Sequence, residues 1–258
     1  MVIMQSKRHL LIGSGQSAFH LNEYLKLLSS IDNSIVVTHW SRKTHSESDL
    51  SVKIQNADCV YLLIKDDSLI EFYNRHPSLK EKPCFHFSGA LASFGNCISV
   101  HPLMSFASHK PLALDLYKSI PFVTDHSQRP KDFLLPNSVQ MVSPEDKKLY
   151  HALCVISGNF TVLLWTMVQK QFTKMNLPPE ILNPYLNQIA KQLMEDPEKS
   201  LSGPFLRKDF KTIEAHLESI HSTPLEPIYL GFLKSYFTEK DLAQILPLNR
   251  FEKNEALC

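Results

Sequence analysis

Three small residues near the N-terminus have the spacing of a phosphate-binding loop. Residues 10–21 read LLIGSGQSAFHL, an apolar run that breaks at Gly13 and Gly15 before helical spacing resumes around Ala18. In a strand–turn–helix unit the first glycine permits a sharp turn, the second lets a pyrophosphate approach, and the small third residue lets helix and strand pack closely. The helix N-terminus then attracts phosphates. We expect a dinucleotide loop, although a plain turn also uses glycines. The predicted loop comprises Gly13, Ser14, Gly15, Gln16, Ser17 and Ala18.

Basic side chains follow the next predicted strand, residues 35–37. At this strand end an acid would bond the ribose 2′-OH of NAD, whereas an arginine accommodates the 2′-phosphate of NADP. The chain reads Trp40-Ser41-Arg42-Lys43 here, without the acid. We expect Ser41 and Arg42 to hold the 2′-phosphate, which favours NADP over NAD. The alternative is a solvated basic turn.

Two further strand ends carry polar groups. Strands are predicted at 58–64 and 84–87, and the ends of parallel strands meet at one edge of a sheet. We expect the first loop to line the ribose by its backbone, although Asp66 or Asp67 could cap the following helix instead. The second loop places a hydroxyl and a flexible backbone at the same edge. The cofactor residues predicted in these loops are Ile64, Lys65, Asp66, Ser88 and Gly89.

The candidate substrate-side residues are two histidines, an asparagine and an arginine. His101 follows a predicted strand at 97–100, where it could act as an acid or base near neutral pH or serve as a structural imidazole. His151 and Asn159 are predicted to share one face of a helix, either meeting a ligand or making buried hydrogen bonds. Arg207 could hold a substrate carboxylate or phosphate, or tie its loop to a neighbouring helix.

Alternating short apolar runs and amphipathic segments in the first half predict the elements that position these residues. The pattern is typical of an α/β fold, a Rossmann-type doubly wound parallel sheet, followed by an all-α domain. We expect a nucleotide-binding domain at residues 1–142, including strands at 120–123 and 138–142, and a helical domain at 143–258. The helical domain opens with a helix from a serine cap at Ser143 to about Met175.

Composition excludes several classes of protein. The 258 residues carry a formal net charge of +1, which gives no electrostatic reason to expect nucleic acid. Five cysteines without a close pair predict free thiols, no metal site and a cytoplasmic protein. Residues 152–169 approach the length of a membrane span, but their polar groups favour a helix buried in a globular protein, so we expect no membrane partner.

Together these residues carry a resemblance that is more specific than the glycine loop. They are Gly-Ser-Gly-Gln-Ser-Ala at 13–18, Trp40-Ser41-Arg42, Asp66, Ser88-Gly89-Ala90, His101-Pro102, Tyr150-His151, Asn159, Ser202-Gly203-Pro204, Arg207-Lys208-Asp209 and His216. The chain resembles NADP-dependent oxidoreductases with a Rossmann-like N-terminal domain and a helical C-terminal domain of unknown function. The resemblance implies kinship with pyrroline-5-carboxylate reductases, deazaflavin-dependent NADP reductases and hydroxyacid dehydrogenases. It also implies that the helical domain at 143–258 supplies the substrate side and the contact of a homodimer.

One departure from these relatives affects the expected mechanism. Hydroxyacid dehydrogenases carry a catalytic lysine one turn before an asparagine on the interdomain helix, and Val155 stands at that position before Asn159. His151 or His101 would have to replace it. The sequence predicts an oxidoreductase that moves a hydride between NADP and a small carbonyl or imine substrate. The alternatives are a non-catalytic NADP-binding or sensing protein and an interaction module with a vestigial glycine turn.

Overall fold

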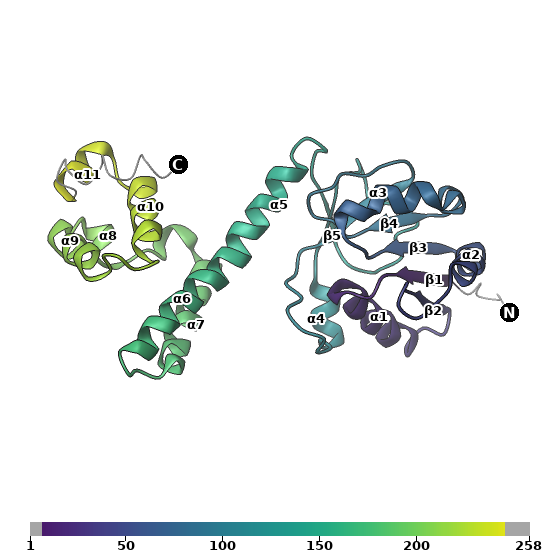
Figure 1. The fold of residues 1–258 in the computed structure, drawn as a ribbon, viewed down its shortest axis with the longest axis horizontal. Coiled ribbons are helices and arrows are strands. Elements are labelled where there is room, and N and C mark those ends of the chain that lie inside the picture. Colours follow the sequence, from purple (N-terminus) through teal and green to yellow (C-terminus); the bar gives the residue numbers. More distant parts are fainter. Residues whose placement is uncertain (1–6, 246–258) are drawn as a thin grey trace. The chain divides into compact units, whose positions relative to one another are not determined.

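The computed structural model describes residues 7–245 of the chain. Two compact units divide between Asn159 and Phe160 (Figure 1). This division lies 17 residues after the expected domain boundary at 142/143, because the first turns of the long helix belong with the sheet.

The first unit contains a seven-stranded, mostly parallel sheet among the described residues, as Figure 1 shows in part. Its order is β2-β1-β3-β4-β5-β6-β7, with β5 and β6 antiparallel and every other neighbouring pair parallel. The predicted Rossmann-like α/β fold is confirmed. The strands are β1 (Lys7–Ile12), β2 (Ile35–Trp40), β3 (Cys59–Leu62), β4 (Cys84–His86), β5 (Cys97–Pro102), β6 (Phe122–Thr124) and β7 (Val139–Met141).

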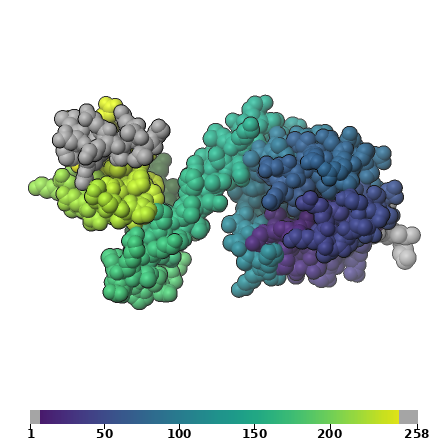
Figure 2. Space-filling view, in the orientation of Figure 1, coloured from purple at the N-terminus to yellow at the C-terminus, as the bar shows by residue number. Residues whose placement is uncertain are grey.

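Helices cover both faces of this sheet because its central strands are apolar on both sides. On one face Leu11 and Tyr61 pack with α1 (Gln16–Ser29) and with Tyr117 of α4 (Leu114–Ser119). On the other, Leu10 and Val60 pack with α2 (Glu47–Asn56) and α3 (Asp66–Arg75). Figure 2 shows this unit as one compact body in purple and blue. The parallel strands therefore end at one edge, where Gly13, Ser88 and the end of β5 come together.

The predicted long helix forms, but it begins later than expected and contains one π-helical turn. Its pieces are α5 (Lys147–Val155), a π-helical turn (Ile156–Phe160) and α6 (Thr161–Lys174). Ser143 does not cap it, because the Ser143 hydroxyl instead accepts the N–H of Asp146, the residue before the helix, at 3.1 Å. The π turn begins between His151 and the exposed Asn159, the two residues predicted to share a helix face.

The expectation that this helix is buried inside the protein is wrong. Over its most apolar 18-residue stretch no residue is buried within the chain, and part of its surface appears in teal and green in Figure 2. By length and composition alone the 28-residue helix could also cross a membrane, which for one helix is weak evidence. The apolar side chains exposed on it include Leu153, Ile156, Phe160, Val162 and Leu163.

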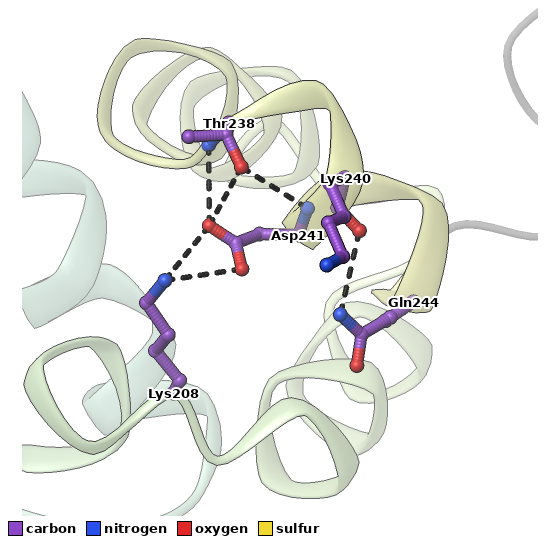
Figure 3. Close-up of polar contacts among 5 residues, drawn as sticks. All are labelled: Lys208, Thr238, Lys240, Asp241 and Gln244. Atoms are coloured by element: carbon purple, nitrogen blue, oxygen red, sulfur yellow. Dashed lines mark hydrogen bonds and ion pairs between the residues drawn. The ribbon is translucent and has the colours of Figure 1, made fainter.

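The second unit is entirely helical in its described residues, as predicted. Its core is a small apolar cluster that includes Ile213, Leu217 and Leu233. In the same unit, the Lys208 ammonium lies 3.0 and 3.1 Å from the two carboxylate oxygens of Asp241 (Figure 3). The helices after α6 are α7 (Asn183–Glu195), α8 (Gly203–Arg207), α9 (Phe210–Ser219), α10 (Glu226–Tyr236) and α11 (Glu239–Ile245). This unit also has 3₁₀ turns at Pro179–Leu182 and Pro197–Lys199, and the sheet unit has one at Pro77–Glu81.

Candidate functional site

The loop after β1 is held by a close backbone contact that only glycine permits. Gly13 has a φ of +144°, and a Cβ there would lie 2.1 Å from the carbonyl oxygen of Leu63. The Gly13 N–H also donates to the carbonyl of Trp40 at 3.0 Å. Gly13 thus joins the ends of β1, β2 and β3, a tighter constraint than the sharp turn that the sequence predicted.

The remaining loop residues leave space at the start of α1. Gly15 is the residue before this helix, and a Cβ added to it would meet no described atom within 4 Å. Ala18 is buried against the sheet. The described first turn carries no acidic residue, so the partial positive charge of the helix end is available to an anion. The Gln16 side-chain oxygen is buried and has no hydrogen-bond partner among the described residues.

The end of β2 places a histidine in contact with this loop, and two basic residues follow it in the chain. The His39 Nε2 contacts the carbonyl oxygen of Gly13, an interaction that sequence reasoning missed. Ser41 is only 4% exposed, and its hydroxyl lies 2.9 Å from the hydroxyl of Thr44. Arg42 and Lys43 are exposed. Of the predicted 2′-phosphate residues, Arg42 is therefore the more available, and Ser41 is largely occupied in shaping the turn.

A hydrogen bond between a serine and an aspartate joins the loops after β3 and β4. Asp66 is the first residue of α3, after Lys65, and the helix has no side-chain cap. Instead the Ser88 hydroxyl donates to the Asp66 carboxylate at 2.5 Å and accepts the Leu91 N–H at 2.9 Å. The capping role considered for Asp66 is therefore not seen. The bond fixes Ser88 at the edge of the sheet, with Ile64 half-buried in the adjacent loop.

The loop after β4 also meets the start of the long helix. A Cβ on Gly89 would lie 2.3 Å from Cδ2 of His151, so the imidazole of His151 rests against the Gly89 backbone. The His151 ring is in turn edge-on to His101, with ring centroids 5.8 Å apart. Two of the four predicted substrate-side residues therefore lie together, within the sheet unit.

His101 is bonded to a tyrosine and is uncharged at neutral pH. Its Nδ1 lies 2.8 Å from the Tyr150 hydroxyl. Burial, and then the charges of Lys147 and His151, lower the pKa of His101 to about 4. At neutral pH the ring is therefore uncharged and can exchange hydrogen bonds with a ligand.

A buried lysine completes this cluster, and the sequence analysis did not identify it. Lys147 is 1% exposed, and its Nζ has no hydrogen-bond partner among the described residues. The Nζ lies 5.8 Å from the centre of the Tyr150 ring. Burial lowers the pKa of Lys147, opposed by the charge of Asp125. Lys147 occupies the first position of α5, where a sequence pattern predicts an exposed cation, so no simple signal could have found it.

The other two predicted substrate-side residues lie on other elements. Asn159 is exposed in the π turn, at the last position of the sheet unit. Arg207 is exposed at the end of α8 in the helical unit. His216, named in the resemblance, is bonded to the Tyr229 hydroxyl at 2.9 Å. The described residues contain no group of three or more His, Cys, Asp or Glu side chains that could hold a metal ion.

Comparison with known proteins identifies relatives of the fold. Residues 134–235 match the family model described as "Domain of unknown function (DUF2520)". No curated protein matches the chain. A structure of a "putative NADP oxidoreductase BF3122" from Bacteroides fragilis is 21% identical, with a TM-score of 0.69, covering 90% of this chain and 98% of that one.

Two further solved structures are similar over most of the chain. Protein TM1727 from Thermotoga maritima is 22% identical, with a TM-score of 0.63, covering 88% of this chain and 96% of its own. Pyrroline carboxylate reductase from Plasmodium falciparum, solved with NADP bound, is 15% identical, with a TM-score of 0.57 and coverages of 94% and 100%. The chain therefore shares with these proteins the fold of a Rossmann-like sheet followed by helices. In this chain the matched domain of unknown function begins within the sheet unit and extends into the helical unit.

Proposed function

We propose that this protein is an NADP-dependent oxidoreductase that moves a hydride between nicotinamide and a small carbonyl or imine compound. The observation that carries the proposal is the loop at the start of α1: Gly13 is held against Leu63, while Gly15 leaves the helix N-terminus open. Arg42 is exposed after β2, where NADP-binding folds place a 2′-phosphate ligand. Two of the similar structures are an NADP oxidoreductase by name and a reductase with NADP bound.

The residues divide by role along the edge of the sheet. The pyrophosphate would lie on residues 13–18, the 2′-phosphate on Arg42 with Ser41 shaping the turn, and the ribose along the loop after β3. Ser88 and Gly89 would lie towards the nicotinamide. When bound, NADPH supplies the hydride, and a proton from solvent completes the alcohol or amine product. The residues proposed on the substrate side are His101, His151, Asn159 and Arg207.

We also propose that the protein forms a homodimer through its helical unit. The exposed apolar side chains of α6, such as Val162 at 61% and Leu163 at 59% exposed, are costly to leave in water. The same unit has an apolar pocket, lined by Leu164 and Val168 of α6 and by side chains such as Phe205 and Phe232. A second copy would bury these surfaces without requiring a membrane.

Calorimetry on the purified full-length chain tests the proposed cofactor. We expect uptake of NADPH with one site per chain, and weaker uptake of NADH. Turnover is then tested by following NADPH absorbance with a panel of aldehydes, ketones and cyclic imines. The proposal is refuted if the folded chain binds neither dinucleotide.

A further inference from the structure

The acidity and basicity of the two groups determine which of them donates in the hydrogen bond between His101 and Tyr150. The 2.8 Å contact between Nδ1 and the phenolic oxygen can be O–H···N or N–H···O, depending on the tautomer of the ring. A phenol is a stronger acid than a neutral imidazole N–H, and an imidazole nitrogen is a stronger acceptor than a phenol oxygen. The O–H···N arrangement is therefore favoured when the ring is neutral.

The surroundings keep both partners in the protonation state that this arrangement needs. Burial raises the pKa of Tyr150, and a side-chain hydrogen bond with Cys154 and the charge of that group raise it further, so the phenol keeps its proton at neutral pH. Burial and the Lys147 charge lower the pKa of His101, so Nδ1 stays free to accept. The charged and titratable groups that act on the pair all come from α5: Lys147 and His151 act on His101, and Cys154 acts on Tyr150. Asp125, which follows β6, acts on Lys147.

The Asp125 carboxylate, whose charge raises the pKa of Lys147, makes no hydrogen bond to the Nζ of this lysine among the described residues. Both carboxylate oxygens of Asp125 accept hydrogen bonds from Ser93, one from its N–H and one from its hydroxyl. The Nζ of Lys147 is buried and has no hydrogen-bond partner in the described part of the chain. The lysine therefore acts on the pair through its charge, since it is buried and lies over the Tyr150 ring.

We propose that Tyr150 is a positioning residue that donates its hydroxyl hydrogen to Nδ1 of His101, so that His101 offers an uncharged Nε2–H group to the acceptor atom of the substrate. Lys147 supports this role by opposing protonation of the ring. A neutral imidazole that polarises a carbonyl needs this tautomer, because the second nitrogen must carry the hydrogen. The inference rests on the proposed function for the identity of the acceptor, a carbonyl oxygen or imine nitrogen.

Nitrogen NMR of the imidazole rings in the cofactor-free, full-length chain tests the tautomer directly. The His101 signals are assigned by their loss in His101→Asn. We expect an unprotonated Nδ1 and a protonated Nε2, unchanged from about pH 8 to about pH 5.5, because the pKa of His101 is about 4. A protonated Nδ1, or a ring that becomes cationic within this range, overturns the proposal.

Two pairs of variants separate positioning from mere packing. Tyr150→Phe keeps the ring but removes the O–H, so the two His101 nitrogen shifts should move towards each other as both tautomers become populated. Tyr229→Phe, which removes the equivalent partner of His216 in the other unit, should leave His101 unchanged. Lys147→Met should raise the pKa of His101 towards its ordinary value, and the exposed neighbour change Lys148→Met should not.

The outcomes remain decisive if a variant fails to fold, because the tautomer is read first in the unaltered chain. An unchanged His101 spectrum in folded Tyr150→Phe contradicts the positioning role. The cofactor proposal fails separately: a chain that binds no NADPH but keeps the Nε2–H tautomer refutes the proposed function and leaves the Tyr150–His101 arrangement in place.

Discussion

The imidazole of His151 lies against the backbone of Gly89 so closely that a Cβ on residue 89 would be 2.3 Å from Cδ2 of His151. We predict that Gly89→Ala displaces this ring and lowers the free energy of unfolding by roughly 1–3 kcal/mol, the usual cost of overpacking. Combining it with His151→Ala should restore part of the loss, because the space is then free. A denaturant-unfolding double-mutant cycle measures this coupling, and strictly additive losses would contradict the close contact.

The two glycines of the first loop should respond in opposite ways to alanine. Gly13→Ala should lower the free energy of unfolding by roughly 2–4 kcal/mol, because it combines a φ of +144° with a 2.1 Å approach to Leu63. Gly15→Ala has open space and a φ of −83°, so its melting temperature should stay close to that of the unaltered chain. Its NADPH affinity should nevertheless fall, because the added methyl group occupies the approach of the pyrophosphate.

Thermal unfolding and calorimetry on the same two proteins check this pair. Equal destabilisation by both changes would argue against the close contact at Gly13. If Gly15→Ala binds NADPH as tightly as the unaltered chain does, the pyrophosphate does not bind at this loop.

Arg42→Ala should discriminate between the two nicotinamide cofactors. Loss of a charge-assisted contact costs about 1.5–3 kcal/mol, so NADPH affinity should fall by roughly 10- to 100-fold and NADH affinity much less. The matched control is Arg75→Ala, an exposed arginine at the end of α3 that is paired with Glu71. Titration calorimetry with both cofactors gives the result, and equal losses for NADPH and NADH would show that Arg42 does not contact the 2′-phosphate.

Acid should destabilise the sheet unit well above the pH at which carboxylates titrate. Burial lowers the pKa values of His9 and His86 to about 4. In the unfolded chain these rings bind protons below about pH 6.5, whereas the folded protein does not until about pH 4, so stability falls as pH drops through this window. We expect a loss on the order of 1–2 kcal/mol for each ring between about pH 7 and about pH 5.

Urea unfolding at a series of pH values measures this slope. His9→Gln should make the slope shallower by about one proton, because one ring no longer titrates. The exposed histidine change His216→Gln provides the control. A slope that is the same in His9→Gln and in the unaltered chain would contradict the burial of an uncharged His9.

Leu163→Glu should prevent association through the helical unit. The side chain is 59% exposed in the single chain, so a charge there costs little in the monomer but would be buried and unpaired in the proposed dimer. Light scattering coupled to size exclusion should then show a monomer. Val52→Glu introduces the same charge at a 57% exposed position on α2 and should leave the dimer intact. A monomeric unaltered chain would refute the proposed dimer.

Much of the fold could be predicted from the sequence because its signals are local. The break at Gly13 and Gly15 between an apolar run and an amphipathic segment indicates a strand, a turn and a helix, and β1 and α1 have these positions. The strands at 35–37, 84–87 and 138–142 were likewise predicted near their observed bounds. Asp209 caps α9 by accepting the Thr212 N–H, a local contact because the two residues are three apart.

Tertiary structure alone decided the contacts that distinguish the candidate site. Nothing local indicates that Gly89 must admit the His151 ring, that Tyr150 bonds to His101, or that Lys147 is buried, because each depends on α5 packing against the loops after β4 and β5. The sequence also gave equal weight to four substrate-side residues. The fold gathers His101 and His151 because parallel strands end at one edge, whereas the π turn leaves Asn159 exposed and the division of the chain assigns Arg207 to the helical unit. Residue types and short spacings determine elements, and the charges and close approaches of a site arise only when distant elements pack together.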